Sequence, residues 1–367
     1  MISLILNNLI RQRVRTVLTV LGIAIGITTV VALGAIVGGL KATAAEILRA
    51  YESDFLVAQK GASDLSFSIV TEEERQAIDA REDVARTIGA LFHVSRLGGN
   101  PFFVTVGMTP ADLSTAGVDV RQGRLFAADD EIMLGERAAS DLDAGLGDEV
   151  ELDDRPFEVV GIYRTDNLFS DSGALAPLPA LQEVAGKAGF VTVVFVSVRE
   201  DLEPSAVAAA IERDHKSLAA VEDVSDYSEV DSGIEIMDAL NLAISALAVG
   251  IGAIGVMNTM AMSVFERTRE IGVLRAVGWS GQRIFRMIMG ESLFLCLLAA
   301  VAGSVLGVVA ARSVVLIPAV RSFLEPQYSI EIFVRALVVA LVVALLGAVY
   351  PVIRALRLTP MEALRHE

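Results

Sequence analysis

The 367-residue sequence lacks the residues that several large classes of protein need. Its only cysteine, Cys296, lies inside an apolar run, so a framework of paired disulfides is excluded. Its three histidines are far apart in the chain and suggest no shared metal site. No segment fits the phosphate-binding pattern G-x-x-x-x-G-K-S/T, because Gly186-Lys187 lacks both the upstream glycine and the hydroxyl residue. We therefore expect no catalytic centre, no metal site and no cofactor bound by this chain.

Positive charge is scarce, and it is unevenly distributed. The formal net charge is -16, yet residues 39–238 alone hold 16 Lys and Arg against 39 Asp and Glu, a balance of -23. The remaining residues carry a balance of +7. A nucleic-acid binder needs a basic face for phosphates, so this class is excluded. We interpret the acidity as a solvated surface, in preference to a site for a cationic ligand.

Long apolar runs are abundant. A membrane core of about 30 Å requires roughly 20 mostly apolar residues in a helix. Four stretches meet this requirement, and we predict spans at 17–40, 239–265, 291–312 and 335–353. The first run is too long for a signal peptide and ends without a small-residue cleavage site, so we expect it to remain as an anchor.

The positions of the arginines predict the orientation of these spans. Arginines are concentrated in residues 1–16, 266–290 and 354–367, which alternate with the other connections. Under the positive-inside rule these three segments are cytoplasmic, whereas 41–238 and 313–334 are extracytoplasmic. Both termini are then cytoplasmic, in a multi-pass protein of the cytoplasmic membrane. Apolar residues of the first segment recur at helical spacing, which predicts an amphipathic helix in contact with lipid at the inner interface.

The large extracytoplasmic segment has a mixed α/β pattern. Runs of β-branched and aromatic residues predict strands at 102–106 and 191–196, and a strand pair at 149–152 and 157–162. Thr71 to Glu74 form a capping-box pattern that opens a helix, and a second helix is expected over 205–215. Residues 41–50 should prolong the first span outward as a stalk. The predicted fold class is therefore a four-span α-helical membrane protein with an inserted α/β domain.

Small residues recur in the spans at the spacing G-x-x-x-G, which lets helix backbones approach closely. The residues concerned are Gly22, Gly26, Gly34, Gly38, Gly303 and Gly307. Two interpretations are equally open. The glycines could pack the four spans of one chain together, or they could form the seam of a dimer.

The loop after the second span is the richest segment. Charged and apolar residues alternate so that Ile271, Leu274 and Arg275 can share one face of a short helix, which Gly278 would end. Such a helix could pass a push from a partner to two membrane spans. The alternative is an ordinary basic loop. Nearby, Glu291 lies at the inner edge of the third span, where we expect a structural ion pair in preference to a proton relay.

The segments Met257–Met260 and Phe265–Gly278 resemble the signature of the MacB/FtsX-like permeases of ABC transporters. The C-terminal segment Tyr350–Arg365 resembles the C-terminal motif of the same family, and Gly135–Gly161 resembles sequence motifs of its outer domain. The resemblance covers the whole chain, and its two cytoplasmic motifs are specific. It implies an extracytoplasmic domain of the MacB periplasmic-core type.

The resemblance also implies roles for two sets of residues. The ATPase-coupling set comprises Glu266, Arg267, Arg269, Glu270, Ile271, Leu274, Arg275, Ala276 and Gly278. The C-terminal motif comprises Pro351, Arg354, Pro360, Glu362, Ala363 and Leu364. In the family the first set forms a coupling helix that docks on an ATPase. The implied partners are two copies of an ATPase subunit that bind ATP and Mg, and a second copy of this chain or a related permease.

Two functions are compatible with these features. The first is a non-catalytic permease subunit that exports or extracts an amphiphile, a peptide or a lipid-linked molecule, driven by a separate ATPase. The second is a transducer that uses ATP-driven motion to regulate an extracytoplasmic enzyme or receptor. The coupling motif serves both, so a cargo pocket in the outer domain would favour the first and a protein-sized exposed patch the second.

Overall fold

The computed structural model describes residues 13–97, 100–165, 168–223, 226, 232–317, 320 and 324–357. Most of the predicted amphipathic helix at 1–16 lies outside these residues, as do Pro360, Glu362, Ala363 and Leu364 of the C-terminal motif. The chain divides into two compact units. The helical unit comprises Met1–Gly38, Asp238–Ser313 and Gln327–Glu367, and the sheet unit comprises Gly39–Met237 and Val314–Pro326.

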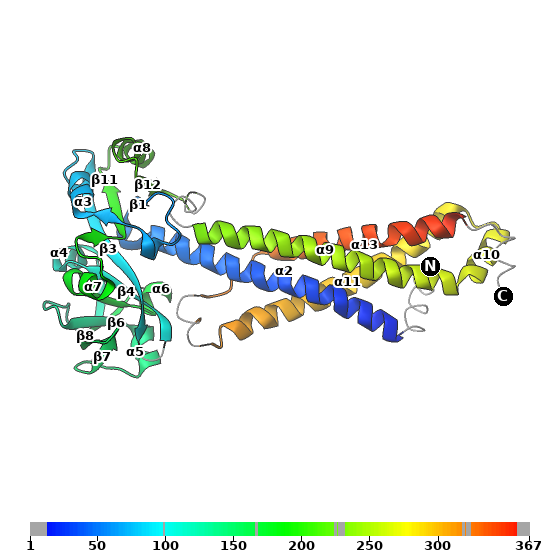
Figure 1. Ribbon diagram of the computed structural model, residues 1–367, viewed down its shortest axis with the longest axis horizontal. Coiled ribbons are helices and arrows are strands. Elements are labelled where there is room, and N and C mark those ends of the chain that lie inside the picture. Colours follow the sequence, from blue (N-terminus) through cyan, green and yellow to red (C-terminus); the bar gives the residue numbers. More distant parts are fainter. Residues whose placement is uncertain are drawn as a thin grey trace. The chain divides into compact units, whose positions relative to one another are not determined.

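Long apolar helices form the helical unit (Figure 1). They are α2 (Arg13–Leu48), α9 (Ser232–Glu266), α11 (Gly281–Val314) and α13 (Ile330–Arg357), with the short α10 (Thr268–Ala276) between α9 and α11. Within the described residues, these four long helices are the ones apolar enough to cross a membrane. Each predicted span falls inside one of them, and each helix extends beyond its predicted span. The predicted stalk is also helical, since α2 runs unbroken to Leu48.

Glycines bring the helix backbones of this unit into close contact. A Cβ atom on Gly303 of α11 would lie 2.7 Å from the Cβ of Ile27 on α2, and one on Gly307 would lie 2.7 Å from the Cβ of Val31. The Thr28 hydroxyl of α2 donates to the Gly303 carbonyl at 3.2 Å, across the same contact. These backbones approach closely only because no side chain stands between them.

The other glycines of the predicted seam can be assigned in the same way. Gly26 faces Ala248 of α9, Gly34 faces Ile332 of α13, and Gly38 faces the backbone of Gln327. Among the described residues these three glycines, like Gly303 and Gly307, therefore contact other segments of the same chain. Gly22 differs, because no heavy atom lies within 4 Å of its Cβ position.

The sheet unit contains twelve strands within the described residues. They are β1 (Phe55–Gln59), β2 (Val70–Thr71), β3 (Val84–Leu97), β4 (Asn100–Met108), β5 (Asp119–Gly123), β6 (Glu131–Gly135), β7 (Glu149–Leu152), β8 (Arg155–Arg164), β9 (Ala174–Pro177), β10 (Phe190–Val191), β11 (Val193–Val198) and β12 (Leu218–Val221). The main sheet has the order β12-β1-β11-β3-β4-β9-β6-β8-β5, with β7 paired to β8, and β10 pairs separately with β2. Most neighbours are antiparallel, but β9 runs parallel to β4 and β6 runs parallel to β8.

Short helices connect and cover these strands (Figure 1). They are α3 (Glu72–Asp79), α4 (Pro110–Thr115), α5 (Glu136–Leu142), α6 (Leu168–Asp171), α7 (Leu178–Ala185) and α8 (Pro204–Asp214), with the 3-10 turns η1 (Ala50–Glu52) and η2 (Leu65–Phe67). The predicted capping box is confirmed, since the Thr71 backbone N–H donates to Glu74 at 2.9 Å and the Glu74 N–H donates to the Thr71 hydroxyl at 3.2 Å. The predicted strands and the second helix coincide with β4, β7, β8, β10–β11 and α8.

Both faces of the sheet are buried, as the alternation along β1 illustrates. Phe55 and Val57 belong to a core that includes residues of α7 and α8. Leu56 and Ala58 belong to a second core on the opposite face, which includes Ala44, Ile47 and Leu48 of α2. The outer end of α2 is thus a structural part of the sheet unit, and its apolar residues are buried against the sheet.

We predict that Gly307→Leu destabilises the protein by about 1–3 kcal/mol, because the added side chain must displace α2. Thermal unfolding of the full chain in detergent would measure the change. Gly22→Leu is the matched control, since its new side chain enters open space. Equal losses for both variants would contradict the assignment of Gly307 to packing within one chain.

Candidate functional site

The helix α10 is joined to its neighbours by two sharp turns of the chain. Arg267 separates it from α9 with non-helical torsion angles (φ -109°, ψ 14°). At its other end Gly278 adopts a left-handed conformation (φ 96°), which ends the helix as the sequence predicts. The Trp279 N–H donates to the Leu274 carbonyl at 3.0 Å across this turn. The chain then enters α11 directly after Ser280.

One face of α10 packs into the helical unit. Ile271 is only 1% exposed and joins a core that includes Val264 of α9 and Ile284 and Met287 of α11. Thr268 is buried, and its hydroxyl donates to the Val264 carbonyl at 3.1 Å. The sequence predicts that one face of this helix carries Ile271, Leu274 and Arg275. This face packs against the other helices and fixes the position of α10.

A buried ion pair fixes the start of α10 to α11. The Arg267 guanidinium lies 2.8 Å from the Glu291 carboxylate, and the two side chains are 16% and 5% exposed. Arg267 also contacts Glu270 at 3.2 Å. The structural ion pair expected for Glu291 is thus present, and its partner is Arg267 in the preceding turn. Such a pair resists separation, because either charge alone would be costly to bury.

The ends of the other spans meet the same junction. Arg275 donates to the Leu356 carbonyl at the end of α13 at 3.3 Å. Glu266, the last residue of α9, pairs with Arg15 of α2 at 2.9 Å. These contacts connect the coupling segment to α2, α9 and α13 as well as to α11.

Two described residues of the C-terminal motif also contribute to this end of the unit. Pro351 is buried within α13. The Arg354 guanidinium lies 3.7 Å from the centroid of the Phe265 ring, on α9, and it donates to the Tyr350 hydroxyl at 3.0 Å. A cation over an aromatic face adds an attractive contact between α13 and α9.

The opposite face of α10 carries exposed side chains. Val273 and Val277 are 46% and 78% exposed, and they are flanked by exposed Arg269, Glu270 and Ala276. Sequence reasoning named the last three residues but missed the two valines. Their spacing of four residues places them on one side of the helix, but it does not indicate which side is buried. The surface made by these five residues is here called the outer face of α10.

A second element of interest connects α2 to the sheet. Tyr51 and Glu52 of η1 adopt left-handed conformations (φ 60° and 55°), so the chain turns sharply between the helix and β1. Arg86 of β3 donates to the Tyr51 carbonyl at 2.8 Å and to the Ser197 hydroxyl of β11 at 3.3 Å. The Tyr51 ring packs edge-on against Phe195 with centroids 5.0 Å apart. We call this arrangement the stalk joint.

The stalk joint has further bonds on both sides. Arg86 also donates to the Thr115 carbonyl of α4 at 3.3 Å. The Ser197 hydroxyl donates to the Glu52 carbonyl at 3.3 Å, and the Val198 N–H donates to the Asp54 carboxylate at 2.7 Å. The turn is therefore bonded to β3 and β11, and Arg86 links it to α4.

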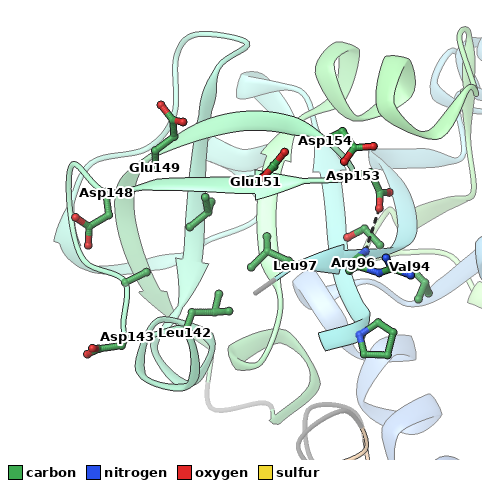
Figure 2. Close-up of a pocket in the computed structure, with 14 residues that line it drawn as sticks. Val94, Arg96, Leu97, Leu142, Asp143, Asp148, Glu149, Glu151, Asp153 and Asp154 are labelled. Atoms are coloured by element: carbon green, nitrogen blue, oxygen red, sulfur yellow. Dashed lines mark hydrogen bonds between the residues drawn. The ribbon is translucent and has the colours of Figure 1, made fainter. Parts of the chain in front are cut away.

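An acidic hollow of about 900 Å³ lies beside β7 (Figure 2). Its carboxylates come from the loop before β7, from the strand itself and from the turn after it. Several of them stabilise the local chain, because Asp148 accepts from the Gly145 N–H at 2.7 Å and Asp153 accepts from the Arg96 N–H at 3.0 Å. Asp153 also contacts His93 at 2.8 Å. Among the described residues, no group of three or more His, Cys, Asp or Glu side chains is placed to hold a metal ion.

We predict that Arg267→Met destabilises the chain by about 3–5 kcal/mol, because it leaves a buried carboxylate without its guanidinium partner. The double variant Arg267→Met/Glu291→Gln should regain most of this loss. Chemical denaturation of the full chain in detergent would test the cycle. If the double variant were as unstable as the two single changes added together, the pair would not be coupled.

Comparison with known proteins gives two family matches. The family described as the MacB-like periplasmic core domain matches residues 16–214, and the FtsX-like permease C-terminal family matches residues 242–360. The periplasmic region of MacB from Actinobacillus actinomycetemcomitans has a TM-score of 0.37 at 13% identity, covering 48% of this chain and 91% of that one.

Curated relatives resemble the chain over nearly its whole length. The macrolide export ATP-binding/permease protein MacB of Nitrobacter winogradskyi is 29% identical over 377 residues, which are 96% of this chain and 58% of the relative. An uncharacterized ABC transporter permease of Methanocaldococcus jannaschii is 24% identical over 389 residues, covering 100% of this chain and 98% of the relative. The chain thus spans about three fifths of the length of the MacB relative. The two family matches together cover most of the chain. The chain therefore belongs to the MacB/FtsX-like family of ABC transporter permeases.

Proposed function

We propose that this permease transmits the ATP-driven motion of a separate ATPase subunit to its sheet unit, and thereby exports or extracts an amphiphile, a peptide or a lipid-linked molecule. The observation that carries the proposal is the two-sided construction of α10. Its inner face is bound to the membrane helices, while its outer face presents exposed valines between charged residues. In this proposal the ATPase binds ATP and Mg, and this chain supplies no catalytic group.

The first step is docking on the outer face of α10. Val273 and Val277 form an apolar centre with Arg269 and Glu270 beside it. An apolar centre with a polar rim is typical of a protein interface. The ATPase would cover this centre.

The second step is the transfer of motion to the membrane helices. A displacement of α10 acts on α11 through the Arg267–Glu291 pair and on α13 through the Arg275–Leu356 bond. Because the pair is buried and the bond ends on the backbone, neither contact yields easily to water. The helix and its supports would therefore move as one body.

The third step is transfer through α2 to the sheet unit. This helix has 36 residues, and at about 1.5 Å per residue such a length spans roughly 54 Å without interruption. The stalk joint binds its outer end to β3 and β11. A continuous helix with a rigid joint passes a push or a twist to the sheet, whereas a flexible linker would absorb it.

The orientation and assembly follow from the same scheme. Residues 266–290 face the cytoplasm, where the ATPase is, and residues 41–238 are extracytoplasmic. Arginines directly after α9, at the start of α11 and at the end of α13 support this orientation. Two ATPase subunits would then serve two permease chains, either two copies of this chain or this chain with a related permease. The name of the Nitrobacter winogradskyi relative describes export of macrolides, and an export role agrees with this direction of force.

We predict that Val273→Asp abolishes binding of the ATPase subunit and leaves folding unchanged, because it puts a charge at the centre of the docking surface. Co-purification of a co-expressed ATPase from membranes would measure binding. Gln282→Asp, an equally exposed change at the start of α11, is the matched control. Retained binding by Val273→Asp would contradict the assignment of the outer face of α10.

We also predict that Arg86→Met uncouples the sheet unit from ATP hydrolysis without loss of ATPase binding, because it removes the bonds that hold the stalk joint. Spin labels at Ala209→Cys in a Cys296→Ser background would report the distance between the sheet units of two chains with and without ATP. The change in distance should shrink in Arg86→Met and persist in the control Arg121→Met, whose guanidinium contacts only exposed Asp119 among the described residues.

ATP hydrolysis by the complex of this permease with its ATPase can distinguish the transport proposal from the transducer. Hydrolysis stimulated by small amphiphiles supports the transport proposal. Hydrolysis that ignores every amphiphile but responds to an extracytoplasmic protein would replace it with the transducer.

A further inference from the structure

Three arginines line one hollow of the sheet unit, although the segment 39–238 carries a net charge of -23. They are Arg49, Arg86 and Arg164. The hollow has a volume of about 470 Å³ and lies at the stalk joint. Its walls come from the outer end of α2, from η1, β3 and the end of β8, and from the residues around the end of α4, all within the sheet unit. A concavity of this size is typical of a small-molecule site.

The charge of Arg86 has no acidic partner among the described residues. Its half-buried guanidinium donates to the Tyr51 and Thr115 carbonyls at 2.8 and 3.3 Å and to the Ser197 hydroxyl at 3.3 Å. A longer contact of 3.5 Å reaches the Glu52 carbonyl. All of these acceptors are uncharged. Because withdrawing an uncompensated charge from water is costly, the site favours an anion from outside the chain.

The other charges of the hollow leave a positive excess. Arg49, the first residue after α2, is exposed, and its side chain makes no hydrogen bond or ion pair within the described part of the chain. Arg164 is also exposed and pairs with Glu136 at 3.4 Å. Two carboxylates line the hollow, those of Glu46 and Glu52, and neither pairs with an arginine of the described residues. Three guanidinium groups against two carboxylates give the lining a balance of +1.

One of these two carboxylates holds its charge less firmly than usual. Burial raises the pKa of the Glu46 carboxyl, and the charge of Glu325, which lies outside the lining, raises it further. A raised pKa favours the neutral acid. An anion that enters the hollow therefore meets less resistance from Glu46 than from an ordinary carboxylate.

From this arrangement we propose that the hollow binds a small soluble anion through a carboxylate or phosphate group held by Arg49 and Arg86. The planar fork of a guanidinium matches the oxygens of both groups. The volume leaves room for an organic part beside the charged group. Such a ligand would contact the end of α2 and β3 together, at the point where they meet in the stalk joint. The site does not depend on the proposed function.

The ligand is expected to come from the aqueous phase. Arg49 lies nine positions beyond residue 40, the predicted end of the first span. Nine residues correspond to about 14 Å of helix, whereas the polar layer on each side of a membrane is about 5–8 Å thick. Lipid headgroups would therefore lie closer to the membrane than Arg49 does.

Isothermal titration calorimetry of the full chain in phosphatidylcholine nanodiscs would measure binding. The probes are phenyl phosphate and benzoate, with benzyl alcohol and benzylamine as their uncharged and cationic counterparts. Arg49→Gln removes one guanidinium from the hollow, and Ala45→Phe adds a ring to its lining without a change of charge. Arg213→Gln is the matched control, because Arg213 is exposed on α8 and does not line the hollow.

We expect both anions to bind with saturation, and the alcohol and the amine to bind at least about tenfold more weakly. Arg49→Gln should weaken both anions by about fivefold, whereas Arg213→Gln should change their affinity by less than about twofold. Ala45→Phe should weaken the anions as well, because it reduces the space in the hollow. This pattern would support the site and its preference for anions.

Four results would overturn the proposal. Absence of saturable binding by both anions would remove the site. Equal affinity for all four probes would mean that the ring is recognised and the charge is not. Equal weakening by Arg49→Gln and Arg213→Gln would mean that the anions respond to the total charge of the unit. A loss of more than about tenfold in phosphatidylglycerol nanodiscs at about 0.15 M salt, where surface charge is screened within about 8 Å, would mean that a lipid headgroup fills the hollow.

Discussion

The structure depends on one helix that belongs to two hydrophobic cores. Ile23, Ala24, Ile27 and Val31 of α2 are buried in the core of the helical unit, and Ala44, Ile47 and Leu48 of the same helix are buried in a core of the sheet unit. The boundary between the two units falls at Gly38 and Gly39, and α2 stays helical through both glycines and on to Leu48. Its outer end cannot move without disturbing buried contacts in the sheet. The stalk joint is therefore the point at which the buried outer end of α2 passes into the sheet.

Much of the fold can be predicted from local patterns. Span positions follow from the length of apolar runs, and strands such as β7 and β8 follow from alternation and from the Asp153-Asp154 turn between them. The coupling helix is recognisable from its alternating charged and apolar residues and from Gly278 at its end. Its orientation is harder to predict, because both faces carry apolar residues and only tertiary contacts decide that Ile271 is buried while Val277 is exposed. The partner of Glu291 is equally hidden from local pattern, because Arg267 precedes it by 24 residues.

The acidic residues of the sheet unit do not together form a binding site. The sheet unit is strongly acidic. Several carboxylates of the acidic hollow nevertheless stabilise the local chain, because Asp148 and Asp153 accept hydrogen bonds from backbone N–H groups. Asp64 likewise accepts from the Ser66 N–H at 2.7 Å, and it interacts electrostatically with Lys187. The acidity of the segment describes its composition and does not by itself identify a binding site.

The position of Trp279 has a practical consequence. The only tryptophan of the chain follows α10 directly, is half-buried, and is held to the Leu274 carbonyl through its backbone N–H. Its side chain packs against the core of the helical unit, two residues beyond Val277 of the outer face. The native emission spectrum of the unlabelled protein is thus an optical signal confined to this junction. Events at the coupling helix can be followed in real time by fluorescence, with no background from the sheet unit.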